Sequence, residues 1–161
     1  MENHIIRKAN STDVNDILRL LIELAVYEKD PDAVKITEKD LLEDGFRDNP
    51  RYECFIAEIN SEIVGLAFYT PRYSTWDGKT LHLEDLVVTE KMRGKGIGLS
   101  LYKSFLKEAK KQGVNRVEWS VLDWNKPAIN FYLKSGALID DYSKWKIVRM
   151  NKSLIEKFLS S

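Results

Sequence analysis

Three glycines and two basic residues form the densest chemical signal in the sequence. Residues 93–98 read Arg-Gly-Lys-Gly-Ile-Gly and lie between a predicted strand and a predicted helix. Glycine lets the backbone pass close to a ligand in conformations that other residues avoid. At a helix N-terminus the backbone N–H groups and the helix dipole favour phosphate, and arginine adds bidentate contacts. The segment therefore predicts a phosphate-binding loop.

Two widespread phosphate loops have different glycine spacings. A Walker loop has four residues between its glycines and ends in Gly-Lys-Ser/Thr, whereas a dinucleotide fingerprint reads Gly-x-Gly-x-x-Gly. Here Gly94, Gly96 and Gly98 are evenly spaced and follow the fourth predicted strand. A plain glycine turn is the remaining alternative, and the strand–helix context favours phosphate over it.

The elements that position this loop follow from hydrophobic periodicity and from turn residues. Asn10 is a candidate helix cap, and Thr37 with Asp40 forms a capping-box pattern. Strands are predicted over residues 4–8, 52–59, 62–70, 79–89, 114–122 and 145–150, and helices over 11–28, 37–45, 98–112, 127–135 and 153–159. Because strands and helices alternate only in part, we expect a mixed α/β sheet with helices on both faces. No linker or repeat divides the chain, so we expect one domain over residues 1–161, with its core at about 5–150.

The strand before the loop carries ionisable side chains. Since side chains alternate along a strand, His82, Glu84 and Leu86 are predicted to share one face.

Charge is balanced in sum and separated along the chain. The sequence has 25 basic and 25 acidic residues, yet residues 23–44 hold eight acids and three lysines, whereas residues 91–116 hold eight basic residues and one acid. Two readings stay open. Each stretch is either a solvated helical face, or the basic stretch receives an anion and the acidic stretch a cation.

Composition excludes several classes of protein. The chain of 161 residues is 43% hydrophobic, so it can bury a core, and disorder is not expected. Its apolar runs are far too short for a membrane span, and the N-terminal residues lack a secretory pattern. A single cysteine, Cys54, excludes an intramolecular disulfide and a Cys-rich zinc site. We expect a cytoplasmic protein that binds no metal, membrane or nucleic acid.

Two motifs resemble the GNAT superfamily of acyl-CoA-dependent N-acetyltransferases. These are Arg-x-x-Gly-x-Gly at residues 93–98 and Asn-x-x-Ala-x-x-Phe-Tyr at residues 125–132. Residues 37–46 and Leu83-Glu84-Asp85 are similar to the spermidine/spermine (diamine) acetyltransferases, and the resemblance spans about residues 5–150. It implies a central mixed, mostly antiparallel sheet and the use of acetyl-CoA as co-substrate.

The resemblance also implies where acetyl-CoA binds. The strand before the loop would pair with the pantetheine arm, the loop amides would hold the pyrophosphate, and residues of the following helix would complete the site. The implied contacts are Leu86, Val87, Val88, Arg93, Gly94, Lys95, Gly96, Ile97, Gly98, Leu99, Asn125, Ala128, Tyr132 and Lys134.

The same resemblance implies the chemistry. Tyr132 would protonate the departing thiolate as general acid, and Glu84 would accept the proton of the amine, directly, through water or through His82. His82 is either part of this relay or a half-buried strand histidine. Tyr27, Glu28, Glu84 and Asp85 would line the site of a small cationic amine.

The sequence departs from the family between residues 139 and 144, where members have an acidic substrate contact. Either Asp140 or Asp141 is a candidate for it. The amine therefore stays open among spermidine, spermine, another diamine and a lysine analogue such as thialysine. Two other functions also stay open, a peptide or protein N-acetyltransferase of the same fold and a non-catalytic acyl-CoA sensor. The resemblance further implies a homodimer.

Overall fold

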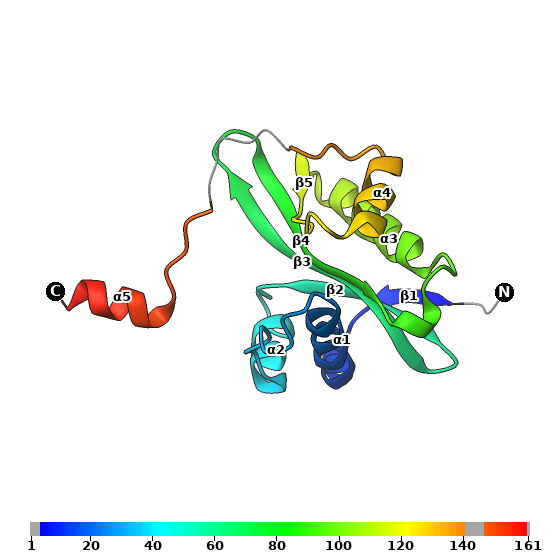
Figure 1. Cartoon of the computed structure of the whole chain (residues 1–161), viewed down its shortest axis with the longest axis horizontal. Coiled ribbons are helices and arrows are strands. Elements are labelled where there is room, and N and C mark those ends of the chain that lie inside the picture. The colour runs from blue at the N-terminus through cyan, green and yellow to red at the C-terminus, as the bar shows by residue number, and fades with distance from the viewer. Residues whose placement is uncertain (1–3, 141–146, 161) are drawn as a thin grey trace. The chain divides into compact units, whose positions relative to one another are not determined.

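A five-stranded sheet is the frame of the structure, a computed structural model that describes residues 4–140 and 147–160 (Figure 1). The strand order is β1-β2-β3-β4-β5, and neighbours are antiparallel except for the parallel pair β4–β5. The strands are β1 Ile5–Lys8, β2 Glu53–Ile59, β3 Glu62–Ser74, β4 Gly78–Val88 and β5 Arg116–Glu118. The expected mixed, mostly antiparallel sheet is confirmed.

Helices cover both faces of this sheet, as expected. Helices α1 (Val14–Tyr27) and α2 (Glu38–Gly45) pack on one face, and α3 (Ile97–Gln112) packs on the other (Figure 1). The predicted caps hold: Asn10 caps the short 3₁₀ turn Ser11–Asp13 before α1, and Thr37 forms a capping box with Asp40. Each cap satisfies backbone N–H groups that a helix end leaves without partners.

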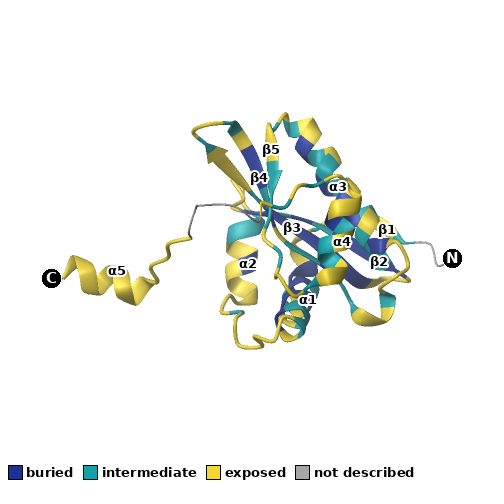
Figure 2. Ribbon diagram, turned by 45° about the horizontal axis from the view of Figure 1, so that its top comes forward, coloured by how far each residue is buried: buried dark blue, intermediate teal, exposed yellow. Residues whose placement is uncertain are grey.

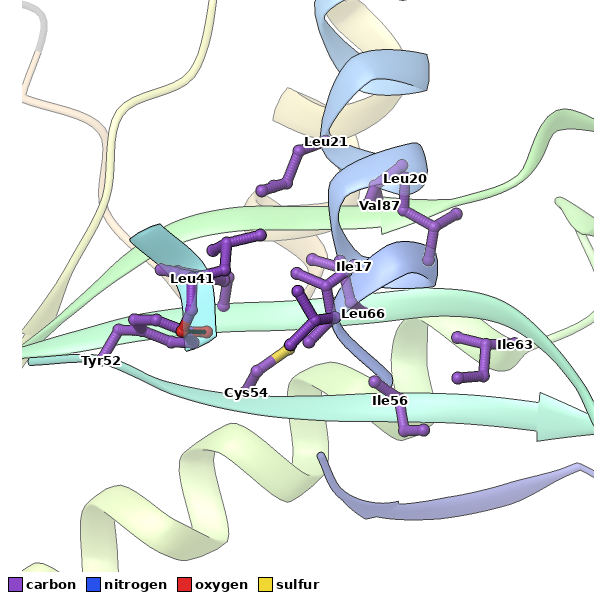
Figure 3. Close-up of a cluster of buried hydrophobic side chains, with 12 residues drawn as sticks. Ile17, Leu20, Leu21, Leu41, Tyr52, Cys54, Ile56, Ile63, Leu66 and Val87 are labelled. Atoms are coloured by element: carbon purple, nitrogen blue, oxygen red, sulfur yellow. Dashed lines mark hydrogen bonds between the residues drawn. The ribbon is translucent and has the colours of Figure 1, made fainter. Parts of the chain in front are cut away.

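A cluster of buried side chains lies between the sheet and helices α1 and α2 (Figure 3). We call this side of the sheet the α1 face. Tyr52 closes one end of the cluster by donating from its hydroxyl to the Leu41 carbonyl at 2.7 Å. The cluster consists of Val14, Ile17, Leu20, Leu21, Leu41, Tyr52, Cys54, Ile56, Ile63, Leu66, Phe68 and Val87. Cys54 is buried there, and burial raises the pKa of its thiol.

The opposite face of the sheet, the α3 face, has its own core. The rings of Tyr69 on β3 and Phe105 on α3 lie 5.3 Å apart, and Ile97 and Leu101 are buried from the same helix. Buried residues concentrate on the central strands β2, β3 and β4 (Figure 2). The sheet is therefore rigidly packed on both sides in the region that carries the site.

The described residues form two compact units, residues 1–120 and residues 121–161. The first contains the sheet and helices α1 to α3. The second contains α4 (Lys126–Lys134) and α5 (Lys152–Leu159), and α5 has Leu154, Ile155, Phe158 and Leu159 exposed. The expectation of a single domain stays a prediction.

Two predicted strand boundaries are wrong for reasons of pairing. Strand β3 continues through Pro71 to Ser74, four residues beyond the predicted end at residue 70. Its pairing with β2 stops at Tyr69, so β3 has an edge beyond that point, and proline is tolerated at sheet edges. The strand expected over residues 114–122 is only Arg116–Glu118.

The last predicted strand, over residues 145–150, is not found in its described part. Residues 147–150 belong to no strand and no helix, and residues 145 and 146 lie outside the described residues. A run of β-forming residues becomes a strand only when a neighbouring strand pairs with it. In the part of the chain that the structure describes, no helix is long and apolar enough to cross a bilayer.

Candidate active site

A β-bulge at Glu84 shapes the centre of the candidate site. Tyr69 of β3 pairs with Leu83 and Phe68 pairs with Asp85, so Glu84 is an extra residue without a partner in the register. A bulge of this kind interrupts the alternation of side chains and re-aims them.

The bulge places two successive carboxylates on the same face of the sheet. Asp85 pairs with Phe68, which belongs to the core cluster of the α1 face. Glu84 Oε1 accepts a hydrogen bond from Thr70 Oγ1 at 3.1 Å, and Thr70 shares the face of Phe68 because it lies two residues further along β3. Glu84 and Asp85 therefore both lie on the α1 face.

One sequence prediction about this strand is half wrong. His82 does share a face with Glu84, because its Nε2 lies 3.8 Å from Glu84 Oε2. Leu86 does not, since it pairs with Ala67, the neighbour of Phe68 that points to the opposite face. The extra residue at position 84 shifts the alternation by one, which a strict period of two could not foresee.

A third carboxylate joins this pair from helix α1. Burial, with smaller contributions from the negative charges of Glu28 and Glu84, raises the pKa of Asp85 to about 6. Glu28 caps the C-terminal end of α1, and partial burial raises the pKa of its carboxyl as well. Carboxylates gathered in this way repel one another, and a cation bound among them relieves that repulsion. The structure thus brings together three of the four residues predicted to line an amine site.

The fourth residue, Tyr27, links this cluster to the glycine loop. The guanidinium carbon of Arg93 lies 4.5 Å from the centroid of the Tyr27 ring, and Arg93 Nε donates to the Val88 carbonyl at 3.0 Å. Arg93 therefore holds the start of the loop against α1 and β4, a role that its charge alone did not predict.

The glycine loop itself is exposed and has the backbone that glycine permits. Gly94 and Gly96 have φ angles of +76° and +83°, values that other residues seldom adopt. A Cβ atom at either position would meet no atom within 4 Å. Glycine is thus required there by conformation and not by a lack of space. Buried Ile97 then begins α3 and anchors the loop, whereas Leu99 is exposed.

An acidic residue of α1 also fixes the segment that leads into the loop. Glu23 of α1 accepts hydrogen bonds from Thr89 Oγ1 and from the Glu90 backbone N–H, both at 2.9 Å. Glu90 begins the 3₁₀ turn Glu90–Met92 that leads into the loop. One member of the acidic stretch is therefore used inside the fold.

Strand β4 has an open edge next to the loop. Strand β5 pairs with β4 only at Thr80, Leu81 and His82. Among the described residues, no strand pairs with that side of β4 at residues 86–88, the stretch predicted to pair with a pantetheine arm. An extended, amide-bearing ligand can bind such an edge through the backbone.

The second unit contains the remaining predicted residues. Asn125 caps α4 by accepting a hydrogen bond from the Ala128 N–H at 3.3 Å. Tyr132 is buried, its ring centroid lies 5.3 Å from that of Phe131, and Lys134 is exposed. Asp140 is exposed, and Asp141 lies outside the described residues. The roles predicted for these side chains stay predictions.

Three residues that contact Glu84 or His82 were missed by sequence reasoning: Thr70, Arg72 and Glu118. Arg72 on β3 contacts His82 and pairs with Glu118 on β5, with Nη1 2.6 Å from Glu118 Oε1. No local pattern marks them, because only the pairing of three strands brings them together. Within residues 4–140 and 147–160, no group of three or more His, Cys, Asp or Glu side chains is arranged to hold a metal ion.

Comparison with known proteins extends these observations. The model of the acetyltransferase (GNAT) family matches residues 15–137. Thialysine N-epsilon-acetyltransferase of Bos taurus is 43% identical over 141 residues, which cover 83% of each chain. The spermidine/spermine N(1)-acetyltransferase-like protein 1 of Homo sapiens is 39% identical over 160 residues, which cover 94% of this chain and 23% of that one. A solved integron cassette protein from the mobile metagenome of V. cholerae has the same fold, with a TM-score of 0.77, 24% identity, and coverage of 100% of this chain and 99% of that chain.

Proposed function

The chain belongs to the GNAT acetyltransferase family, and from that premise we propose that it acetylates a primary amine of a small polycationic or lysine-like molecule with acetyl-CoA. The relatives named above act on thialysine or are named for spermidine and spermine. These molecules share a free primary amine and at least one further ammonium group.

The observation that carries this proposal is the carboxylate cluster of Glu28, Glu84 and Asp85. An isolated ammonium group needs one counter-charge, whereas this cluster has three, with Asp85 within electrostatic range of both Glu28 and Glu84. A substrate with several ammonium groups satisfies more than one of them while one amine reacts. We therefore propose that Glu28 and Asp85, with Tyr27 beside them, hold the charged part of the substrate.

Proton transfer requires a base for the incoming amine. Glu84 is exposed enough to meet a ligand and is oriented by Thr70, so we assign it the proton that the ammonium group loses before attack. Acetyl-CoA supplies the thioester carbon, to which the amine nitrogen forms its new bond while the carbon–sulfur bond breaks. The leaving thiolate takes a proton, and we assign that donor to Tyr132 on the resemblance of residues 125–132.

The residues proposed to hold acetyl-CoA fit the parts of that molecule. The open edge of β4 at Leu86, Val87 and Val88 suits the amides of a pantetheine arm. The exposed loop at the N-terminus of α3, with Arg93 and Lys95 beside it, suits a pyrophosphate.

A thiol-release screen tests the proposal. The screen compares amine substrates at equal concentration in the presence of acetyl-CoA. The amines are thialysine, lysine, spermidine, spermine, simple diamines and peptides. We expect small amines to be used and peptides to be poor substrates. Faster thiol release with peptides would identify a peptide acetyltransferase. Binding of acetyl-CoA without thiol release in the presence of any tested amine would identify an acyl-CoA sensor. The variant Asp32→Asn, which changes an exposed acid on the loop after α1, is the control for the variant Asp85→Asn.

Three further expectations are proposals with separate support. The homodimer rests on the family resemblance, and light scattering measures it. The expectation of no nucleic-acid partner rests on zero net charge, and that of no membrane partner on the short apolar runs; mobility-shift and vesicle assays measure them. The cytoplasmic location rests on the sequence alone and is measured by cell fractionation.

A further inference from the structure

A chain of polar contacts leads across three strands to Glu84. It begins on β5, where Arg116 Nη2 lies 2.9 Å from Glu118 Oε2. Glu118 Oε1 lies 2.6 Å from Arg72 Nη1, and the same Arg72 nitrogen lies 3.2 Å from His82 Nδ1. The register places Glu118 directly beside His82 on the neighbouring strand, so these contacts follow from strand pairing.

The contact with arginine determines which nitrogen of His82 carries the proton. A guanidinium group has donors only, so His82 Nδ1 accepts from Arg72. The proton of the neutral ring is then on Nε2, the nitrogen that faces Glu84 Oε2 at 3.8 Å. At this separation the pair closes through a small side-chain rotation or through one bridging water.

Both carboxylate oxygens of Glu84 are thus faced by hydrogen-bond donors. Thr70 donates to Oε1, and His82 Nε2–H faces Oε2. Two donors on two different oxygens hold the Glu84 carboxylate in one orientation.

We propose that His82 is a positioning residue for Glu84, held by Arg72 in the tautomer that donates to the Glu84 carboxylate. The proposal rests on the proposed role of Glu84 in proton transfer. It also separates two readings of His82. A ring that already has a proton on the nitrogen nearest to Glu84 cannot accept another proton there, so His82 orients the base and does not relay its proton.

A matched set of substitutions at position 82 tests this in the assembled enzyme. Gln places an amide donor near the position of Nε2, whereas Asn places it near Nδ1 and Leu has no donor. We expect His82→Leu and His82→Asn to lower kcat/KM for the amine about tenfold, with an unchanged Kd for acetyl-CoA. His82→Gln should recover most of the rate, and His4→Leu, at the other histidine, should stay within about twofold of the wild type. A His82→Gln rate as low as that of His82→Leu would overturn the proposal.

A double-mutant cycle with Glu84→Gln shows whether His82 acts through Glu84. We expect His82→Leu to cause no further loss of kcat/KM for the amine when Glu84 has already been replaced by Gln. The same loss in both backgrounds, or no loss in either, overturns the positioning role. A wild-type rate for Glu84→Gln contradicts the base assignment itself, so the two failures are distinguishable.

The tautomer can be measured without any activity. The chain has two histidines, so a protein labelled with ¹⁵N-histidine gives two ring systems, which the His4→Leu variant assigns. We expect His82 as the Nε2–H tautomer at a pH where the ring is neutral, and a mixture of tautomers in Arg72→Leu. An Nδ1–H tautomer in the wild type would overturn the proposal.

Discussion

The guanidinium group of Arg93 lies over the ring of Tyr27, 4.5 Å from its centroid. This contact joins the first residue of the glycine loop to the last residue of α1, and the carboxylate cluster begins at the next residue, Glu28. The Arg93–Tyr27 contact thus borders both the proposed acetyl-CoA site and the proposed amine site. We therefore expect a substitution at this contact to change the binding of both ligands.

Replacing Tyr27 tests the role of this contact in acetyl-CoA binding. A cation–π contact at a partly exposed site contributes about 0.5–1 kcal/mol, so Tyr27→Leu should weaken acetyl-CoA binding about 2–5-fold. Tyr27→Phe keeps the ring and should bind as the wild type does. Calorimetric titration with acetyl-CoA measures both variants, and equal affinities for Leu and Phe would show that the ring does not support the loop.

Replacing Asp85 should stabilise the fold while it impairs the enzyme. Folding raises the pKa of this carboxyl from 3.8 to about 6. The ionised form is therefore disfavoured in the folded state, and its cost develops as the pH rises through this interval and is complete above it. Asp85→Asn removes that cost, so we expect its free energy of unfolding to exceed that of the wild type by about 1–2 kcal/mol at about pH 8 and to match it near pH 4.

Urea unfolding at the two pH values measures this difference, and Asp32→Asn is the control. In the same variant, the KM for the amine should rise roughly tenfold because a counter-charge is lost. In the wild type, kcat/KM for the amine should fall as the pH drops below about 6, where Asp85 becomes neutral. A variant with unchanged KM would remove Asp85 from the amine site.

The glycine loop offers a matched pair of substitutions. Gly96 has a φ of +83°, whereas a Cβ at Gly98 would lie 3.7 Å from Val88 Cγ2, an ordinary contact. Gly96→Ala should cost about 1–2 kcal/mol of loop strain and weaken acetyl-CoA binding about tenfold or more. Gly98→Ala should leave the loop in place. Equal binding by both variants would contradict a role for the left-handed backbone.

The proposed role of Tyr132 as general acid is tested by removing its hydroxyl group. Tyr132→Phe should lower kcat about 100-fold, the range of a lost general acid, with an unchanged Kd for acetyl-CoA. The exposed Tyr73→Phe is the control and should keep the wild-type rate. Stopped-flow measurement of thiol release gives the rate, and an unchanged kcat would exclude Tyr132 as the acid.

Charge separation along the chain has several explanations in the structure. Asp40 caps α2, Asp44 pairs with Arg51, and Glu23 holds the turn before the glycine loop. Arg116, at the end of the basic stretch, pairs with Asp77 and Glu118. Of the acidic stretch, Glu28 joins the carboxylate cluster, whereas Glu23, Asp40, Asp44 and, in the basic stretch, Arg116 stabilise the fold.

Local signals in the sequence predicted the glycine loop, the helix caps and the strand that carries Glu84. Glycine spacing located the loop, capping residues located the start of the 3₁₀ turn before α1 and the start of α2, and residues 83–85 were correctly placed on a strand. These features depend on neighbours within a few residues, which the sequence contains. The resemblance of residues 93–98 and 125–132 determined the family.

How the side chains of the site meet depends on contacts between segments that are distant in the sequence. The bulge at Glu84 arises from the pairing of β4 with β3, and it moves Asp85 onto the face of Glu84 while it turns Leu86 away. Arg93 reaches Tyr27, and Arg72 reaches His82 and Glu118, across strands and helices that are distant in the sequence. The physical reason is that side-chain alternation is a local rule, whereas strand register and bulges are set by hydrogen bonds between segments, which no single segment encodes.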